Sequence, residues 1–367
     1  MSVVLFTGFP GFLGSALLPR TLRRAPAARA VALVQEKFAE QARRTLAAIE
    51  RADPGIAGRT DLVTGDITVP GLGLSDADRS RLLAGPLEIF HLAAVYDLSV
   101  PAELGWRVNV DGTRNVVDLA RAAMDGSGLT RLQYVSTCYV SGRYDGIFSE
   151  TDLELGQPFA NHYDHTKHEA ERVVAKARDA GLPVSVYRPS IVVGDSVTGA
   201  TQKYDGPYYL LQLLARQGRT AFVPLPRRAS RTRFNLVPSD YVVDAIAALA
   251  GHDAAVNRTF ALAQPDPPTV TRMCEVFADR LGARLRTIPM ATGPAAFAID
   301  RVPGVGRFLK VPSSTLEYLT HPSRYDTAAT TRMLSELGVH CPAFDDHVDA
   351  MVAYFRANPQ VGSTAMI

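Results

Sequence analysis

The sequence contains little cysteine, little net charge and no long hydrophobic run. Its three cysteines, Cys138, Cys274 and Cys341, lie far apart, which excludes a disulfide framework and favours a reducing, cytoplasmic location. A formal net charge of +2 over 367 residues gives no electrostatic basis for a nucleic-acid partner. No apolar stretch reaches about 18 residues, so we expect no transmembrane segment.

Short apolar runs alternate with amphipathic stretches in the first half of the chain. The runs predict strands at 3–7, 30–34, 60–65, 87–92, 131–136 and 183–188. The stretches between them predict helices at 12–24, 38–51, 75–84, 102–124 and 161–180. This alternation predicts an α/β fold, a doubly wound parallel sheet covered by helices on both faces.

The alternation fades after Pro189. We therefore expect a first domain at 1–190, to which a segment near 234–262 returns, and a smaller discontinuous lobe within 191–367.

Three glycines follow the first predicted strand. Gly8, Gly11 and Gly14 have the spacing G-x-x-G-x-x-G, and a stretch of helical character begins at Phe12 and Leu13. Glycines let the backbone turn tightly and approach a ligand, while the N-terminus of a helix attracts phosphate. A plain tight turn is the alternative, but the strand before and the helix after favour a nucleotide site.

A tyrosine and a lysine are four residues apart on the predicted helix 161–180. The spacing places Tyr163 and Lys167 on one helix face, where the ammonium would lower the pKa of the phenol. Such a tyrosine can exchange a proton with a carbonyl oxygen. Ser136 and Thr137 end the strand at 131–136, and either hydroxyl could hold the same oxygen. A surface helix and a hydroxyl-rich turn are the alternative.

Taken together in order, these motifs resemble the extended short-chain dehydrogenase/reductase family over nearly all of residues 1–250. The segments that carry the resemblance include Gly65–Ile67, His91–Ala94, Asn109–Thr113, Tyr134–Thr137, Tyr187–Ile191 and Val237–Val242. The resemblance implies a Rossmann domain, an NAD(P) cofactor and catalysis by Thr137, Tyr163 and Lys167. It also implies a set of cofactor-binding residues: Gly8, Gly11, Phe12, Leu13, Gly14, Lys37, Arg44, Asp66, Ile67, Leu92, Ala93, Ala94, Asn109, Tyr163, Lys167, Pro189, Ser190 and Ile191.

The roles within this set also follow from the resemblance. Thr137 and Tyr163 would bind the substrate oxygen, Tyr163 would donate the proton, and Lys167 would hold the nicotinamide ribose. The loop length of the family, counted back from Gly142, favours Thr137 over Ser136.

A narrower branch is more similar still. Gly11–Gly14, Ala93–Ser99 and Val193–Gly199 resemble fatty acyl-CoA reductases and the terminal reductase domains of peptide synthetases and carboxylic acid reductases. The resemblance implies reduction of an acyl thioester to an aldehyde or alcohol. No adenylation or carrier domain precedes the glycine motif, so we expect a separate CoA or carrier-protein ester. The alternatives are an aldehyde or ketone reductase, a sugar-nucleotide epimerase or dehydratase, and a regulator without catalysis.

Basic residues after the second strand favour NADPH over NAD. Gln35 stands where this branch often has arginine, and Glu36 could bind a ribose hydroxyl but is displaced by one position. Lys37 lies close by, and Arg44 resembles the branch's arginine for the 2′-phosphate. A solvated helix face is the alternative interpretation.

Three further features have competing interpretations. His162, His165 and His168 recur every three residues, but no other ligand spacing supports a metal, and we expect none. The arginines 227, 228, 231 and 233 form either a solvated loop or a site for the phosphates of CoA or phosphopantetheine. The apolar stretch 295–319 is expected to be core of the lobe, with an acyl channel or a membrane contact as alternatives.

Overall fold

A parallel sheet forms the centre of the protein in the computed structural model, which describes residues 2–96, 100–291 and 315–362. The strand order is β11-β7-β5-β4-β1-β2-β3, and every pairing is parallel. The strands are β1 (Val3–Thr7), β2 (Arg29–Val34), β3 (Thr60–Thr64), β4 (Leu87–His91), β5 (Leu129–Val135), β7 (Val184–Pro189) and β11 (Thr259–Leu262). The predicted doubly wound fold is confirmed, and its order reverses between β1 and β4, where such folds bind ligands.

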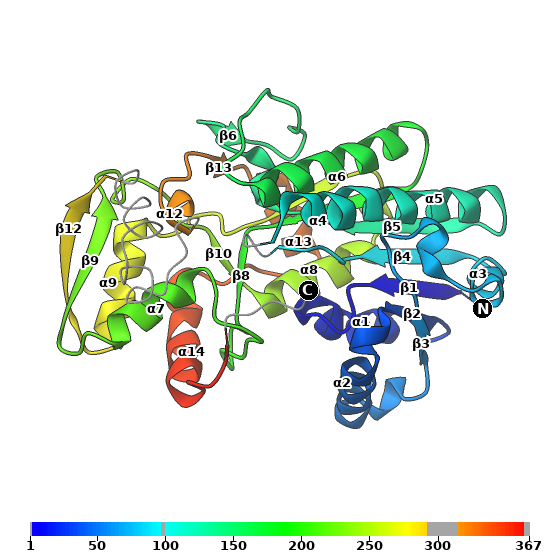
Figure 1. The fold of residues 1–367 in the computed structure, drawn as a ribbon, viewed down its shortest axis with the longest axis horizontal. Helices are drawn as coiled ribbons and strands as arrows, with labels where there is room; N and C mark the ends of the chain where they lie inside the picture. Colours follow the sequence, from blue (N-terminus) through cyan, green and yellow to red (C-terminus); the bar gives the residue numbers. More distant parts are fainter. Residues whose placement is uncertain (1, 97–99, 292–314, 363–367) are drawn as a thin grey trace.

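Helices cover both faces of the sheet (Figure 1). One layer contains α1 (Phe12–Arg24), α2 (Ala39–Ala52) and α8 (Ser239–Ala250), and the other contains α3 (Asp76–Leu82), α5 (Gly112–Asp125) and α6 (His162–Asp179). Val4 and Phe6 of β1 pack into the first layer, and Leu5 packs into the second. This alternation is the period of a strand that is buried on both faces.

The predicted helix 102–124 is interrupted. It consists of α4 (Ala102–Trp106), a π-helical turn η4 (Arg107–Asp111) and α5. The π-turn contains the predicted cofactor residue Asn109. Such turns occur often at functional sites. Short 3₁₀ turns occur at η1 (Glu36–Phe38), η2 (Pro54–Ile56), η3 (Pro70–Gly73), η5 (Cys138–Ser141) and η6 (Asp253–Ala255).

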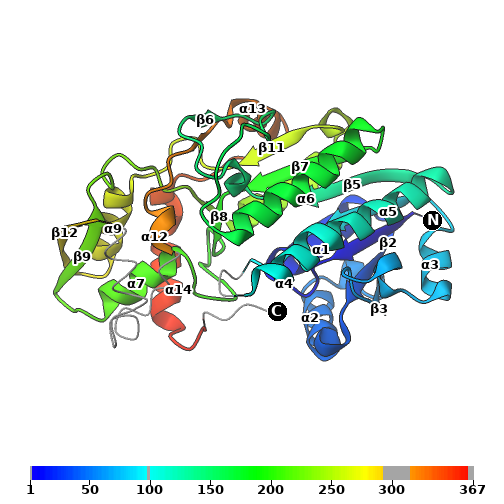
Figure 2. The same cartoon turned by 45° about the horizontal axis from the view of Figure 1, so that its top comes forward.

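A separate apolar core lies in the lobe, at the left of Figures 1 and 2. It is built from α7 (Pro207–Ala215), α9 (Val270–Arg280), α14 (Phe344–Ala357) and the parallel pair β9 (Thr220–Pro226) and β12 (Arg284–Met290). Two further short parallel pairs are β8 (Ile191–Val193) with β10 (Leu236–Pro238), and β6 (Ile147–Phe148) with β13 (Arg324–Tyr325).

The end of the chain contributes to both parts. Helix α12 (Thr315–Tyr318) precedes β13, and α13 (Ala328–Glu336) packs on β11 and α8, although the sequence placed this stretch in the lobe. Residues 295–314 of the apolar stretch predicted as lobe core lie outside the described residues. In the part of the chain that the structure describes, no helix has the length and apolarity needed to cross a membrane.

Candidate active site

Three positions at the turn between β1 and α1 have room only for glycine. The Gly11 amide donates to the Gly8 carbonyl oxygen over 2.9 Å. Gly8 has a φ of 92°, and a Cβ there would lie 2.8 Å from the Ala93 nitrogen. A Cβ on Gly11 or Gly14 would lie 2.7 or 2.6 Å from the Gly8 oxygen. The turn therefore requires the glycine spacing that the sequence contains, because a side chain would collide with backbone.

Two features of this region fit a dinucleotide. No side chain caps α1, and no acidic residue lies in its first turn, which begins with Phe12 and Leu13. The amides of a first helical turn have no partner within the helix, so they can donate to phosphate oxygens. The Ser190 hydroxyl, directly after β7, is buried and has no hydrogen-bond partner among the described residues. An orphaned buried hydroxyl at this position suits a polar group of a ligand.

A neutral histidine fixes the end of β4 beside the glycine turn. Nδ1 of His91 lies 2.7 Å from the Thr7 hydroxyl, and Nε2 lies 3.0 Å from the Thr113 hydroxyl. Thr113 donates to the Asn109 carbonyl oxygen, so it accepts from Nε2, and Nδ1 accepts from Thr7. Burial lowers the pKa of His91 to about 3, which keeps the ring neutral. The network holds the backbone that leads into the next predicted cofactor residues, Leu92, Ala93 and Ala94.

The predicted cofactor residues Asp66 and Ile67 follow β3 and are held by neighbouring side chains and backbone. The Asp66 carboxylate accepts from the Gln35 amide over 2.9 Å and from the Thr68 amide and hydroxyl over 2.8 Å each. Ile67 is buried against α5, where a Cβ on Gly112 would lie 2.8 Å from its Cδ1. The two residues therefore have fixed positions after β3.

The residues predicted to select the cofactor lie on the segment that follows β2. The Lys37 ammonium lies 5.0 Å from the centre of the Phe38 ring. Arg44 donates to Glu40 over 2.8 Å, and its side chain is 79% exposed. Glu36, the alternative ribose ligand, accepts from the Thr64 hydroxyl over 3.2 Å. Glu36 and Lys37 thus lie in η1, directly after β2, and Arg44 lies on α2.

Asn109 joins three segments of the site. Its side chain accepts from the Val95 amide over 2.8 Å and donates to the Val95 carbonyl oxygen over 3.0 Å. It also donates to the Thr166 hydroxyl over 3.0 Å, and Thr166 donates to the Tyr163 carbonyl oxygen. Asn109 therefore ties the segment after β4 to helix α6.

Thr137 and Ser136 point to different partners. The Thr137 hydroxyl lies beside Tyr163, close enough to lower the pKa of the tyrosine. The Ser136 hydroxyl instead donates to the buried Glu171 carboxylate. Thr137 also donates weakly, over 3.4 Å, to the carbonyl oxygen of Pro189, the residue before Ser190 and Ile191. Of the two hydroxyls that the sequence offered, the structure brings Thr137 to the tyrosine.

The pKa of Tyr163 is shifted in the direction opposite to the predicted one. Burial raises it, the neighbouring charge of Asp164 raises it further, and the hydrogen bond from Thr137 acts against them. The predicted lowering by Lys167 is wrong for this arrangement of side chains. A raised pKa keeps the phenol protonated at neutral pH, as a proton donor requires.

Lys167 is buried and bonded to β5. Its ammonium donates to the Tyr134 hydroxyl over 3.1 Å and to the Val135 carbonyl oxygen over 2.9 Å. Burial lowers the pKa of Lys167 to about 8, against the opposing effect of Glu171. Because the Lys167 ammonium is bonded to β5 and not to the tyrosine, it does not lower the pKa of Tyr163 as predicted.

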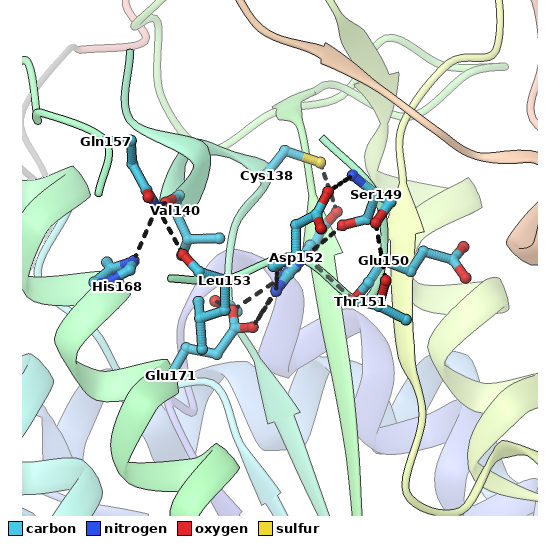
Figure 3. A network of polar contacts seen from close by, with 12 residues as sticks. Cys138, Val140, Ser149, Glu150, Thr151, Asp152, Leu153, Gln157, His168 and Glu171 are labelled. Carbon is cyan, nitrogen blue, oxygen red and sulfur yellow. Dashed lines mark hydrogen bonds and ion pairs between the residues drawn. The ribbon is translucent and has the colours of Figure 1, made fainter. Parts of the chain in front are cut away.

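An ion pair that is almost fully buried supports the site from behind. Arg188 on β7 donates to Glu171 on α6 over 2.6 Å, and their side chains are 4% and 3% exposed. Arg188 also donates to the carbonyl oxygens of Ser149 and Asp152, over 3.2 and 2.7 Å. Figure 3 shows Glu171 and the 149–153 segment in this network. The pair joins α6, β7 and the segment around β6.

The three helix histidines have separate surroundings. His165 is exposed and stacks on Phe159 at 5.1 Å, whereas buried His168 lies 3.4 Å from the Gln157 amide. Over the described ranges, no group of at least three histidine, cysteine or acidic side chains could hold a metal ion.

The arginine loop follows β9 and packs on the start of α9. Its anchor is the buried Ala229, and the Val270 amide donates to the Thr232 carbonyl oxygen. Arg233 is held by Asp266 at 3.3 Å and by the Pro267 carbonyl oxygen at 2.8 Å. The exposed arginines 227, 228 and 231 remain as candidates for an anion.

Several residues of the site were not singled out from the sequence. Glu171 lies one turn after Lys167 on the same helix face, so its spacing was a usable signal. Thr113 becomes recognisable as a partner of His91 only when β4 and α5 come together.

The comparisons agree with this geometry. The model of the NAD-binding male sterility protein family matches residues 6–246, more than half of the chain. The chain belongs to this family, the thioester reductase branch of the extended short-chain dehydrogenases/reductases. The resemblance predicted from the sequence is confirmed.

Individual relatives are large synthetases and reductases. One component of the linear gramicidin synthase of Brevibacillus parabrevis is 28% identical over 375 residues, covering 98% of this chain and 7% of that protein. Fatty acyl-CoA reductase wat of Drosophila melanogaster is 24% identical, covering 56% of this chain and 46% of that protein. The chain spans 7% to 26% of the length of the first peptide synthetases that it matches.

A solved structure is similar over almost the whole chain. The terminal R domain from the myxalamid PKS-NRPS biosynthetic pathway has a TM-score of 0.81 and 26% identity, covering 99% of this chain and 93% of that one. The similarity extends over the lobe as well as the sheet.

Proposed function

We propose that the protein uses NADPH to reduce an acyl thioester, held on CoA or a carrier protein, to an aldehyde or alcohol. The observation that carries the proposal is the placement of the Thr137 hydroxyl beside Tyr163, on a turn that also contacts Pro189, the residue before Ser190. Membership of the family supports it, as do the names fatty acyl-CoA reductase and terminal R domain among the similar proteins.

In this proposal the two parts of the chain have different tasks. Residues 1–190, with the segment near 234–262, hold the cofactor, and the lobe within 191–367 receives the acyl group. Gly8 and Gly11 shape the turn, the first-turn amides of α1 bind the diphosphate, and Asp66 lies at the adenine end.

Two hydroxyl groups would act on the substrate. Thr137 and Tyr163 hydrogen-bond the carbonyl oxygen and stabilise the negative charge that develops there. Tyr163 then transfers its proton to that oxygen. Lys167, whose ammonium is held on β5, would bind the nicotinamide ribose, and Ser136 keeps Glu171 in place behind the strand.

When bound, the cofactor supplies the hydride that the carbonyl carbon accepts. A thioester reduced in this way becomes a hemithioacetal, which expels the thiol and leaves the aldehyde. Reduction to the alcohol needs a second hydride, from a second NADPH, and repeats the same proton transfer from Tyr163.

The preference for NADPH rests on Lys37 and Arg44. Both are presented after β2, where a 2′-phosphate would lie in this fold. An arginine makes strong charge-assisted hydrogen bonds to phosphate.

The thioester carrier would meet the exposed arginines 227, 228 and 231. No acidic residue occurs between Asp205 and Asp240, so this surface of the lobe is positive locally in a chain of little net charge. The phosphates of CoA or of a phosphopantetheine arm suit such a surface.

The reaction is tested with NADPH and NADH oxidation against a substrate panel. The panel contains octanoyl-CoA, palmitoyl-CoA, the matching aldehydes and a ketone, with identification of products. Thioester-dependent oxidation that yields aldehyde or alcohol supports the proposal. Turnover of aldehyde or ketone with no thioester turnover would replace it with a plain carbonyl reductase.

The proton donor is tested by Tyr163→Phe, which keeps the ring. We expect turnover to fall by a factor on the order of 10² or more while cofactor still binds. Measuring kcat and the cofactor Kd by fluorescence titration separates the two effects. Near-normal turnover would contradict the assignment of Tyr163.

A further inference from the structure

A buried carboxylate stands beside the proposed proton donor. Asp164, the residue after Tyr163, is 1% exposed. It accepts from the Asn161 amide over 3.1 Å and from the Tyr318 hydroxyl over 3.4 Å. Asn161 also donates to the Tyr318 hydroxyl over 3.3 Å, so the three side chains form a closed ring of contacts. Burying an ionisable carboxyl group among neutral partners makes its charged form costly, which calls for a function.

The ring contains the cap of the catalytic helix. Asn161 precedes α6, and its side-chain oxygen accepts from the Asp164 amide over 2.9 Å. This satisfies one of the otherwise unpaired amides of the first turn. Tyr163 belongs to the same turn, so a shift of the hydrogen-bonded side chains of Asn161 and Asp164 would also shift the tyrosine.

Tyr318 also contacts the turn that carries Thr137. Its ring lies 4.8 Å from the ring of Tyr139, edge to face at 88°. The Tyr139 amide donates to the Thr137 hydroxyl over 3.2 Å. One residue of α12, 154 positions along the chain from Asp164, therefore contacts both elements that carry the proposed catalytic hydroxyls.

Resting on the proposed function of Tyr163, we propose that Asp164 and Tyr318 are positioning residues for proton transfer. They hold the first turn of α6 and the Thr137 turn so that both hydroxyls reach one substrate oxygen. Because Tyr318 comes from the C-terminal part of the chain, that part completes the active site although it carries no proposed catalytic residue.

The charge of Asp164 supplies a signature of this role. The titratable groups that face it from the described elements are Tyr163 on α6, Tyr139 on η5, Glu317 and Tyr318 on α12, and Tyr325 on β13. Burial raises the pKa of Asp164 to about 8, so the carboxyl is mostly neutral at pH 7 and ionises as the pH rises.

An ionised Asp164 opposes the reaction. Tyr163 becomes a phenolate when it gives up its proton, and a neighbouring negative charge disfavours that state. Reduction by the wild type should therefore slow as the pH rises through about 8. Lys167, whose pKa burial also lowers to about 8, contributes to the same decline.

The test compares variants of the full chain with NADPH and octanoyl-CoA between about pH 6 and 9.5. Tyr318→Phe should lower kcat at pH 7 about 5-fold with little change in KM, because binding is intact and alignment is not. The ratio of activity at pH 9 to activity at pH 7 should be higher for Asp164→Asn than for the wild type. In the variant only the deprotonation of Lys167 still lowers activity as the pH rises. The double variant should lose less than the product of the single losses.

Tyr325→Phe is the matched control. It removes a hydroxyl of the same segment that also lies near Asp164 but hydrogen-bonds to His321, at 2.8 Å, and not to Asn161, Asp164 or Tyr318. Equal kcat for the Tyr318 and Tyr325 variants, or equal pH profiles for wild type and Asp164→Asn, would overturn the inference. A lowered thermal midpoint of Tyr318→Phe that accounts for its loss of kcat would also overturn the inference, because the role of Tyr318 would then be structural.

The result can be separated from failure of the proposed function. If Tyr163→Phe is inactive while the ring variants behave as wild type, only the positioning role fails. If Tyr163→Phe keeps normal turnover, the proton donor is wrong and the inference fails with it.

Discussion

Charged side chains are used in opposite ways in the sheet domain and in the lobe. Behind the proposed catalytic residues, Arg188 and Glu171 are paired and almost fully buried, and Lys167 is bonded on β5. On the lobe, the arginines 227, 228 and 231 are exposed. Buried pairs fix geometry and are barely screened, whereas exposed charges act at a distance and weaken with salt. The sheet side suits chemistry at fixed positions, and the lobe suits the capture of an anion.

The largest effect is expected from breaking the buried pair. Glu171→Ala leaves Arg188 charged and buried without its partner, and also removes the acceptor of the Ser136 hydroxyl. Loss of one partner of such a pair costs roughly 3–5 kcal/mol in the free energy of unfolding. Urea unfolding measures it.

The control for this experiment is Glu40→Ala. Glu40 also pairs with an arginine, Arg44, but its side chain is 64% exposed. The unfolding midpoint should hardly move, because solvent replaces an exposed partner. A similar shift in both variants would show that burial does not distinguish the two pairs.

Most of the sheet could be predicted from the sequence. The predicted strands 3–7 and 183–188 agree with β1 and β7 to within one residue at each end. Strand β1 is an apolar run up to Thr7, as is typical of a strand that is buried on both faces. The π-turn at Arg107–Asp111 could not be predicted, since its residues fit a regular helix equally well. Strand β9 ends in a stretch rich in proline and arginine, which the sequence did not predict as a strand.

The candidate site was predictable where its residues are close in sequence. The glycine turn and the spacing of Tyr163 and Lys167 are local patterns. The partners of these residues are not local: Lys167 bonds to a strand 33 positions away, and Asp164 to Tyr318 at 154 positions. The direction of the Tyr163 pKa depends on such partners and on burial, which no short pattern encodes.

Exposed charges within the sheet domain sharpen the comparison. Replacing both Lys37 and Arg44 by alanine should raise the KM for NADPH about 10-fold and leave that for NADH little changed, since only NADPH has a 2′-phosphate to lose contact with. Steady-state kinetics with both cofactors measure the ratio. Arg43→Ala is the matched control, because Arg43 also pairs with Glu40 and is 60% exposed. Equal losses for NADPH and NADH would show that the two residues are only solvated surface charges.

The smallest effect is expected on the lobe. Changing the arginines 227, 228 and 231 to alanine should raise the KM for octanoyl-CoA by roughly 3-fold, as exposed charges contribute modestly to binding. The KM for octanal should stay the same, because it has no phosphate. Added salt should raise the wild-type KM for octanoyl-CoA towards that of the variant, and should change the KM of the variant little. Arg233→Ala is the control, since this side chain is already held by Asp266 and the Pro267 carbonyl oxygen. An equal rise for the aldehyde, or an equal effect of Arg233→Ala, would mean that the loop shapes the lobe and does not receive the carrier.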